Sequence, residues 1–242
     1  MTRKNGVAFW AIVLAMLPAV LDQTILATAL PTIASDLGRL ADVSWVVTAY
    51  VVAAAATAPL WGRLGDRYGR KLVLEVSLAL FLATSAVCGV TQSLWMLVVA
   101  RGIQGAAAGG LMSLAQAAVG DLVSPRERGR YQGYIMAVFA VAASLGPLLG
   151  GLLVDHASWR WVFYVNLPIG AVALVGLHLR LPAAEPGTAG GRLDLPGAIL
   201  LAAGTIALML ACLWGGQRYG WGSPPIIALL AGSAVLGAAL AL

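Results

Sequence analysis

Charged side chains are scarce in this chain. Asp, Glu, Lys and Arg make up 10% of its 242 residues, whereas hydrophobic residues make up 60% and the mean hydropathy is +0.89. A soluble domain is normally about half apolar and about a quarter charged. The deficit of charge excludes an ordinary soluble domain, and the excess of apolar residues indicates a polytopic membrane protein.

Cysteine and histidine are also rare. The two cysteines, Cys88 and Cys212, both lie in apolar segments and have no neighbour at metal-ligand spacing, which argues against a disulfide framework or a metal site. The ATPase motif GxxxxGK[ST] is absent from the sequence. Paired carboxylates, histidine clusters and a nucleophile elbow are absent too. We therefore expect no cofactor and no enzymatic activity.

The balance of charge is basic, with a formal net charge of +5 and an isoelectric point near 9.6. Such a balance can indicate nucleic-acid binding when the basic residues line one face. Here they fall in short gaps between apolar runs. We expect membrane lipid and not nucleic acid as the partner.

Apolar runs of about 20 residues, the length that crosses about 30 Å of hydrocarbon, recur along the chain. The first resembles a secretory signal, but Asp22 interrupts it and further spans follow, which favours a membrane helix. The expected fold class is therefore an all-α polytopic membrane protein. Its predicted helices cover residues 7–30, 43–61, 72–90, 94–119, 131–154, 161–180, 196–214 and 224–242.

The distribution of Lys and Arg orients these helices. With the amino terminus in the cytoplasm, eleven Lys and Arg lie inside and three, Arg39, Arg160 and Arg218, lie outside. The positive-inside rule selects this topology over its reverse. We expect a multi-pass protein of the plasma (inner) membrane with a cytoplasmic amino terminus.

Two ionisable residues, Asp22 and Arg101, lie well inside predicted spans. Each costs about 2.5–3.5 kcal/mol at a helix centre on insertion scales, so each calls for a reason. Counted from Leu30 and Leu94, both lie roughly 10–12 Å below the outer surface. Equal depth predicts a direct or water-bridged pair, which either serves function or only stabilises helix packing.

The fourth span carries a polar stripe beside a seam of small residues. Arg101 shares a helix face with Gln104, by the three- and four-residue spacing of helical neighbours. Gly102, Ala106 and Gly110 form a second row that predicts close helix contact. This combination is typical of a helix that lines a cavity.

Two short loops mix both signs of charge. Residues 62–71 hold four Lys and Arg with three glycines, and residues 121–130 begin with Asp121. We expect Asp66 and Asp121 to bind nearby arginines by charge-assisted hydrogen bonds, which would lock the two loops together. The alternative is that these charges only set topology, although that role needs Arg and Lys more than Asp.

The fifth span contains Gly146, Pro147, Gly150 and Gly151. Proline removes a hydrogen bond and crowds the preceding turn, while the glycines leave a bare face for close packing. The pattern predicts a kinked, glycine-lined helix. An ordinary proline kink in a membrane helix is the alternative.

Several of these segments resemble motifs of the major facilitator superfamily. Residues 62–71 are similar to its GxLaDrxGrk loop, and residues 101–105 resemble the RxxQG motif of the fourth helix, whose arginine the family links to proton coupling. Residues 142–151 resemble the antiporter motif GxxxGPxxGG, with Ala142 in place of the first glycine. Residues 21–31 and 159–170 resemble the first helix and the start of the sixth in fourteen-span drug:proton antiporters.

The resemblance implies a domain organisation. An amino-terminal six-helix bundle would cover residues 1–180, a cytoplasmic linker 181–195, and two further membrane helices 196–242. These two helices would be the linker helices of the fourteen-span branch, the alternative being the start of a second six-helix half. Since the last apolar run has no charged flank, we expect a truncated product whose carboxy-terminal half is missing.

The resemblance also implies roles for the residues. Asp22, Arg101 and Gln104 would couple substrate to protons, and Gly146, Pro147, Gly150 and Gly151 would form the antiporter kink. The inner gate would comprise Gly62, Asp66, Arg67, Gly69, Arg70 and Asp121.

The expected function is proton-coupled efflux of drugs or other small hydrophobic or cationic molecules by alternating access. Alternatives are a sugar, metabolite or amino-acid transporter of the same fold, and a non-transporting scaffold or nonfunctional half-transporter.

Overall fold

Helices account for nearly all of the described chain. The computed structural model describes residues 3–38, 40–181, 195–216 and 218–241. Apart from turns and one isolated bridge between Gly215 and Tyr219, these ranges are helical, which confirms the all-α fold. The helices are α1 (Arg3–Leu37), α2 (Leu40–Tyr68), α3 (Arg70–Gly89), α4 (Leu94–Leu122), α5 (Arg128–His156), α6 (Trp161–Tyr164), α7 (Asn166–Arg180), α8 (Leu195–Trp214) and α9 (Pro224–Ala241).

The helices have the dimensions of membrane spans. Among the described residues, seven segments are long and apolar enough to cross a bilayer, one of them formed by α6 and α7 together, and the described part of α9 is a shorter apolar helix. The predicted end of the first span at residue 30 is wrong, because α1 continues to Leu37. Pro18 and Pro31 lie inside α1 without ending it, as membrane helices allow.

The predicted span over 161–180 is confirmed as one apolar segment, Trp161–Arg180. Its helix is divided at Val165, between α6 and α7. Pro168 has no N–H to donate to the carbonyl of Tyr164, and its ring crowds that carbonyl. The division leaves Asn166 as the first residue of α7.

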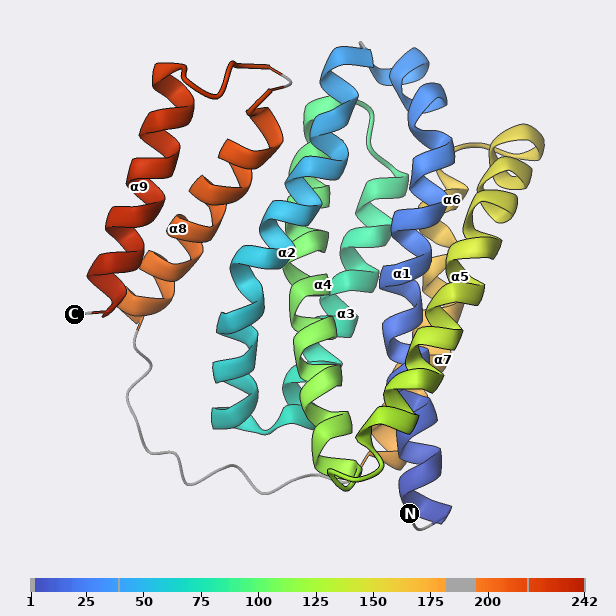
Figure 1. Cartoon of the computed structure of the whole chain (residues 1–242). Helices are drawn as coiled ribbons and strands as arrows, with labels where there is room; N and C mark the ends of the chain where they lie inside the picture. The colour runs from blue at the N-terminus through green and yellow to red at the C-terminus, as the bar shows by residue number, and fades with distance from the viewer. Residues whose placement is uncertain (1–2, 39, 182–194, 217, 242) are drawn as a thin grey trace.

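The helices run side by side in alternating directions (Figure 1). The start of α1 and the α2–α3 and α4–α5 turns lie at one end of the bundle, and the α1–α2, α3–α4 and α5–α6 connections lie at the other. Gly69 makes the abrupt α2–α3 turn with a φ of 90°, a value that favours glycine. Residues 62–71 and 121–128 therefore share one end of the molecule.

The apolar core is divided into two clusters along the helices. One includes Phe9, Met16 and Phe81 toward the amino-terminal end of α1, and the other includes Ile33 and Leu97 toward the opposite end. On α1, α3 and α4 the change from one cluster to the other falls near residues 20, 85 and 103. Buried polar residues occupy this boundary.

Helices α2 and α4 approach closely along small residues. A Cβ at Gly105 would collide with the backbone of Tyr50, and one at Gly109 with the backbone of Ala54. Gly110 belongs to the same seam, since it packs against the Trp61 ring. Gly102 does not, because its missing Cβ would meet no atom within 4 Å.

Helices α8 and α9 form a pair beside α2 (Figure 1). The Ser233 hydroxyl donates to the Gly204 carbonyl at 3.0 Å between the two helices. The Trp214 ring packs edge-on against Trp45 of α2, with centroids 5.7 Å apart. Most of the predicted linker, residues 182–194, lies outside the described residues.

Candidate functional site

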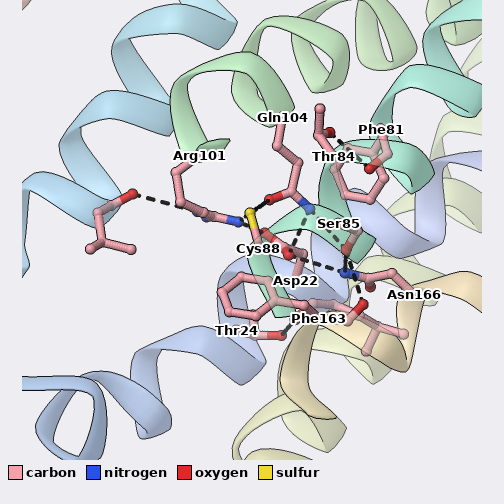
Figure 2. Close-up of polar contacts among 12 residues, drawn as sticks. Asp22, Thr24, Phe81, Thr84, Ser85, Cys88, Arg101, Gln104, Phe163 and Asn166 are labelled. Carbon is pink, nitrogen blue, oxygen red and sulfur yellow. Dashed lines mark hydrogen bonds and ion pairs between the residues drawn. The ribbon is translucent and has the colours of Figure 1, made fainter. Parts of the chain in front are cut away.

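A buried ion pair occupies the boundary between the two apolar clusters. Asp22 of α1 and Arg101 of α4 are both completely buried, and Arg101 Nη1 donates directly to Asp22 Oδ2 (Figure 2). A buried charge is costly unless it is paired and hydrogen-bonded. The pair therefore depends on the polar groups around it.

Gln104 joins the pair from the next turn of α4. Its Oε1 accepts from Arg101 Nη1 at 2.8 Å, and its Nε2 donates to Asp22 Oδ1 at 3.3 Å. The same amide donates to the Ser85 hydroxyl of α3 at 3.1 Å. The structure thus brings together Asp22, Arg101 and Gln104, the three residues singled out in the sequence for coupling.

Asn166 and Ser85 complete this site, and the sequence did not mark either. Asn166 Nδ2 donates to Asp22 Oδ1 at 3.0 Å and to Ser85 Oγ at 3.1 Å (Figure 2). The Ser85 hydroxyl in turn donates to the Phe163 carbonyl at 2.9 Å, just before the division between α6 and α7. An amide side chain in an otherwise apolar span was the available signal for Asn166.

Aromatic rings enclose the guanidinium of Arg101. Its Cζ lies 4.2 Å from the centroid of the Tyr50 ring on α2 and 5.9 Å from that of Phe163. In the described structure Arg101 Nη2 has no hydrogen-bond acceptor, so the face of Tyr50 provides electrostatic stabilisation by a cation–π contact. Cys88 Sγ lies 3.5 Å from Gln104 Oε1, which places this thiol in the same layer.

Tyr50 also lines a groove of about 630 Å³. It runs between α1, α2 and α4, and most of its wall consists of alanine, valine, glycine and methionine. Its polar members are Gln23, Tyr50, Ser113 and Gln116. Small apolar walls with a few polar groups are typical of a site for a small hydrophobic molecule.

A second polar cluster joins the two charged loops. Arg70 Nη1 lies 2.5 Å from Asp121 Oδ2 and 2.9 Å from the Ala117 carbonyl, and Nη2 lies 3.3 Å from Asp66 Oδ1. Arg70 thus links the ends of α2, α3 and α4. The carboxylates are more than half exposed, so salt and water screen the pairs.

The other predicted gate residues have different surroundings. Gly69 forms the turn before α3, as described above. The Arg67 guanidinium lies over the ring of Tyr68, with Cζ 5.5 Å from the centroid. A Cβ at Gly62 would meet no atom within 4 Å, whereas one at Gly65 would collide with Leu114. Gly65 was not among the predicted gate residues. Its missing Cβ leaves room for the Leu114 side chain of α4 against α2.

The glycines of α5 pack against α1. A Cβ at Gly146 would collide with Thr24, and one at Gly150 with Thr28. Pro147 is exposed, and Gly151 has open space beside it. Val141, Leu145, Leu148 and Leu152 form an exposed apolar row on the same helix. The four predicted residues are thus divided between an inner and an outer side of α5.

No group of three or more His, Cys, Asp or Glu side chains in the described ranges could hold a metal ion. The sequence profile of the Major Facilitator Superfamily matches residues 12–242. The chain belongs to the major facilitator superfamily.

Curated relatives within this superfamily carry transport names. The chain is 41% identical over 233 residues to the uncharacterized MFS-type transporter Rv1877 of Mycobacterium tuberculosis, covering 96% of this chain and 34% of that protein. It is 40% identical to the MFS-type efflux pump LUC4 of a Fusarium species, covering 91% and 41%. Its identity to the multidrug transporter protein MdtP of Bacillus subtilis is 36%, covering 94% and 42%.

Solved structures show the same fold. The human organic anion transporter MFSD10 matches with a TM-score of 0.70 at 21% identity, over 94% of this chain and 60% of that chain. At this identity the likeness concerns the fold alone. The chain spans 34–42% of the length of the three curated relatives named above.

Proposed function

We propose that this chain belongs to a proton-coupled exporter of small hydrophobic or cationic molecules. The observation that carries the proposal is the completely buried Asp22–Arg101 pair one side chain away from an apolar groove. Intramembrane ionisable residues mark ion and substrate pathways, because a span does not otherwise tolerate them. The names of LUC4 and MdtP support efflux and multidrug transport for this chain.

Tyr50 would connect substrate binding with protonation. Tyr50 lines the groove, and the centroid of its ring lies 4.2 Å from Cζ of the Arg101 guanidinium. A substrate that displaced this ring would open a path from the groove to Asp22, where a cationic substrate would favour the charged carboxylate. A proton on Asp22 would remove the charge that attracts the cation, so substrate and proton would compete for Asp22.

The Arg70 cluster would serve as the inner gate. Two ion pairs and one hydrogen bond to a backbone carbonyl hold the ends of α2, α3 and α4 together, and the exposed carboxylates allow the ion pairs to break at little cost. We place this end and the amino terminus in the cytoplasm, in a plasma membrane, because Lys and Arg gather there. Gly62 and Arg67 would affect the gate only indirectly.

Alternating access requires a second bundle that rocks against the first. The exposed row on α5, Val141, Leu145, Leu148 and Leu152, would face such a bundle. Gly146 and Gly150 would hold α5 on α1, and Pro147 would shape the outer side. The second bundle would come from further chain of the kind that the longer relatives possess.

Dye extrusion tests the proposal. A full-length transporter that contains these residues is expressed in cells without endogenous efflux pumps, and loss of a fluorescent cationic dye is followed. We expect extrusion that stops when a protonophore collapses the gradient. Extrusion that survives the protonophore would contradict proton coupling, and the absence of extrusion for dyes, with uptake of sugars instead, would contradict the exporter. The 242-residue chain assayed alone distinguishes a self-sufficient unit from one that needs the second bundle.

A further inference from the structure

Asn166 differs from the other partners of Asp22 in one respect. Its Nδ2 makes two hydrogen bonds, to Asp22 Oδ1 at 3.0 Å and Ser85 Oγ at 3.1 Å, yet its Oδ1 is buried and has no partner among the described residues. Buried polar atoms are nearly always hydrogen-bonded, so an unpaired acceptor at the centre of a site calls for an explanation.

The other donors to Asp22 cannot change their role. Arg101 carries only N–H groups and can never accept a hydrogen bond. Gln104 has a carbonyl oxygen, but Arg101 Nη1 at 2.8 Å and Cys88 Sγ at 3.5 Å already occupy it. Turning the Gln104 amide would break both contacts. Turning the Asn166 amide would break no hydrogen bond of its oxygen, because that oxygen has none among the described residues.

Protonation of Asp22 demands such a change. The carboxylate accepts hydrogen bonds from Arg101, Gln104 and Asn166, whereas a carboxylic acid must also donate one. The remaining titratable groups near Asp22 are Tyr50 from α2 and Cys88 from α3, and α7 contributes Asn166. Oδ1 is the oxygen away from Arg101, so a proton there would point toward Asn166 and Gln104.

We propose that Asn166 is the residue that stabilises Asp22 in both protonation states. With the carboxylate, its Nδ2 donates to Oδ1, as in Figure 2. When Oδ1 takes up a proton from water, the amide makes a half-turn about the Cβ–Cγ bond, and Asn166 Oδ1 accepts from the new O–H group. The Ser85 hydroxyl, which now donates to the Phe163 carbonyl, can turn to donate to the same amide oxygen.

This inference rests on the proposed function, in which Asp22 is the proton carrier. Asn166 is a positioning residue, since it would hold the proton on Asp22 and not carry it. Its location at the start of α7 gives the switch a mechanical output. A turn of its amide changes the hydrogen bonds of the Ser85 hydroxyl, which reaches the Phe163 carbonyl at the α6–α7 division.

Side-chain amide NMR tests the switch directly. Asn5 and Asn166 are the two asparagines of the chain, so asparagine-specific isotope labelling gives two side-chain signals, which Asn5→Gln distinguishes. The 242-residue chain in lipid nanodiscs is titrated with pH, and infrared difference spectra record the Asp22 carboxylic acid, identified by its loss in Asp22→Asn. We expect the side-chain carbonyl carbon signal of Asn166 to move downfield and its side-chain amide proton signals to move upfield. Both changes should have the same pH midpoint as the infrared band of the Asp22 carboxylic acid.

The outcomes separate this inference from the function on which it rests. If the acid band appears and the Asn166 carbonyl carbon does not move downfield, the switch is refuted while Asp22 remains a proton site. If no Asp22 acid band forms across the pH range in which the protein stays folded, the proton site itself is refuted. Asn166→Leu, of similar volume and without hydrogen-bonding atoms, should alter the midpoint or sharpness of the Asp22 titration. An unchanged titration in that variant would also overturn the switch.

Discussion

Asp22 and Arg101, 79 residues apart in sequence, form a direct ion pair in which neither side chain reaches solvent. Four further side chains from four other helices surround them: Tyr50, Ser85, Phe163 and Asn166. The pair therefore ties together α1, α2, α3, α4 and the α6–α7 division at one level. A change of charge at Asp22 would therefore alter the polar contacts of all these helices.

Loss of one partner should destabilise the bundle strongly. Asp22→Leu leaves Arg101 buried without a counter-charge, which typically costs about 3–5 kcal/mol. The double variant Asp22→Leu, Arg101→Leu removes the orphaned charge and should recover part of that loss. Thermal and denaturant unfolding in detergent measure both. Equal stability of wild type and the single variant, or a double variant worse than the sum of the two singles, would refute this account of the pair.

The seam between α2 and α4 offers a matched test of packing. Gly105→Ala places a methyl group against the Tyr50 backbone and should cost about 1–3 kcal/mol of unfolding free energy, since a backbone cannot yield as a side chain can. Gly102→Ala, on the same helix, meets no neighbour and should be neutral or slightly stabilising. The comparison is made by unfolding both variants. Equal effects at the two positions would contradict the seam.

Removal of the Tyr50 ring should weaken the connection between groove and ion pair. A desolvated cation–π contact is worth up to about 2 kcal/mol, or about 30-fold in an equilibrium. Tyr50→Phe keeps the ring and should stay within about threefold of wild type in substrate affinity, whereas Tyr50→Leu removes the contact that substrate must break and should bind substrate about tenfold more tightly. Transport kinetics of a full-length transporter over a range of pH provide the measurement. Equal behaviour of the Phe and Leu variants would show that the ring has no such role.

The Arg70 cluster should affect conformation more than stability. Exposed ion pairs contribute about 0–1 kcal/mol, so Asp121→Asn and Asp66→Asn should unfold close to wild type. Asp121 lies 2.5 Å from Arg70 and Asp66 lies 3.3 Å away, so Asp121→Asn should shift the gate further. Cysteine accessibility from each side of the membrane reports that shift. No shift in either variant would refute the gate.

Much of the fold could be read from the sequence, because membrane spans are set by length and apolar composition. Counting residues from Leu30 and Leu94 predicted a pair between Asp22 and Arg101, and the structure joins the two side chains, although α1 continues beyond Leu30 to Leu37. The sequence could not give the rotation of each helix about its own axis, which decides the residues that face a neighbouring helix. This is why Gly102 was assigned to the seam in place of Gly105 and Gly109.

Ser85 and Asn166 were not among the predicted site residues, for two different reasons. Serine and threonine in membrane helices commonly bond to their own helix, as Ser77 and Thr84 do with the carbonyls of Leu74 and Leu80. Nothing in the sequence distinguishes Ser85 from these two neighbours. Asn166 required knowledge that Pro168 divides the sixth span and that α7 begins beside α1.

Substrate-induced proton release tests the central claim most directly. A purified full-length transporter that contains these residues is held in weakly buffered detergent solution with a pH indicator, and a transported cationic dye is added. If Asp22 binds a proton that substrate displaces, the wild type releases protons near neutral pH and Asp22→Asn, at equal dye occupancy, releases none. Proton release of equal size from Asp22→Asn would contradict the account.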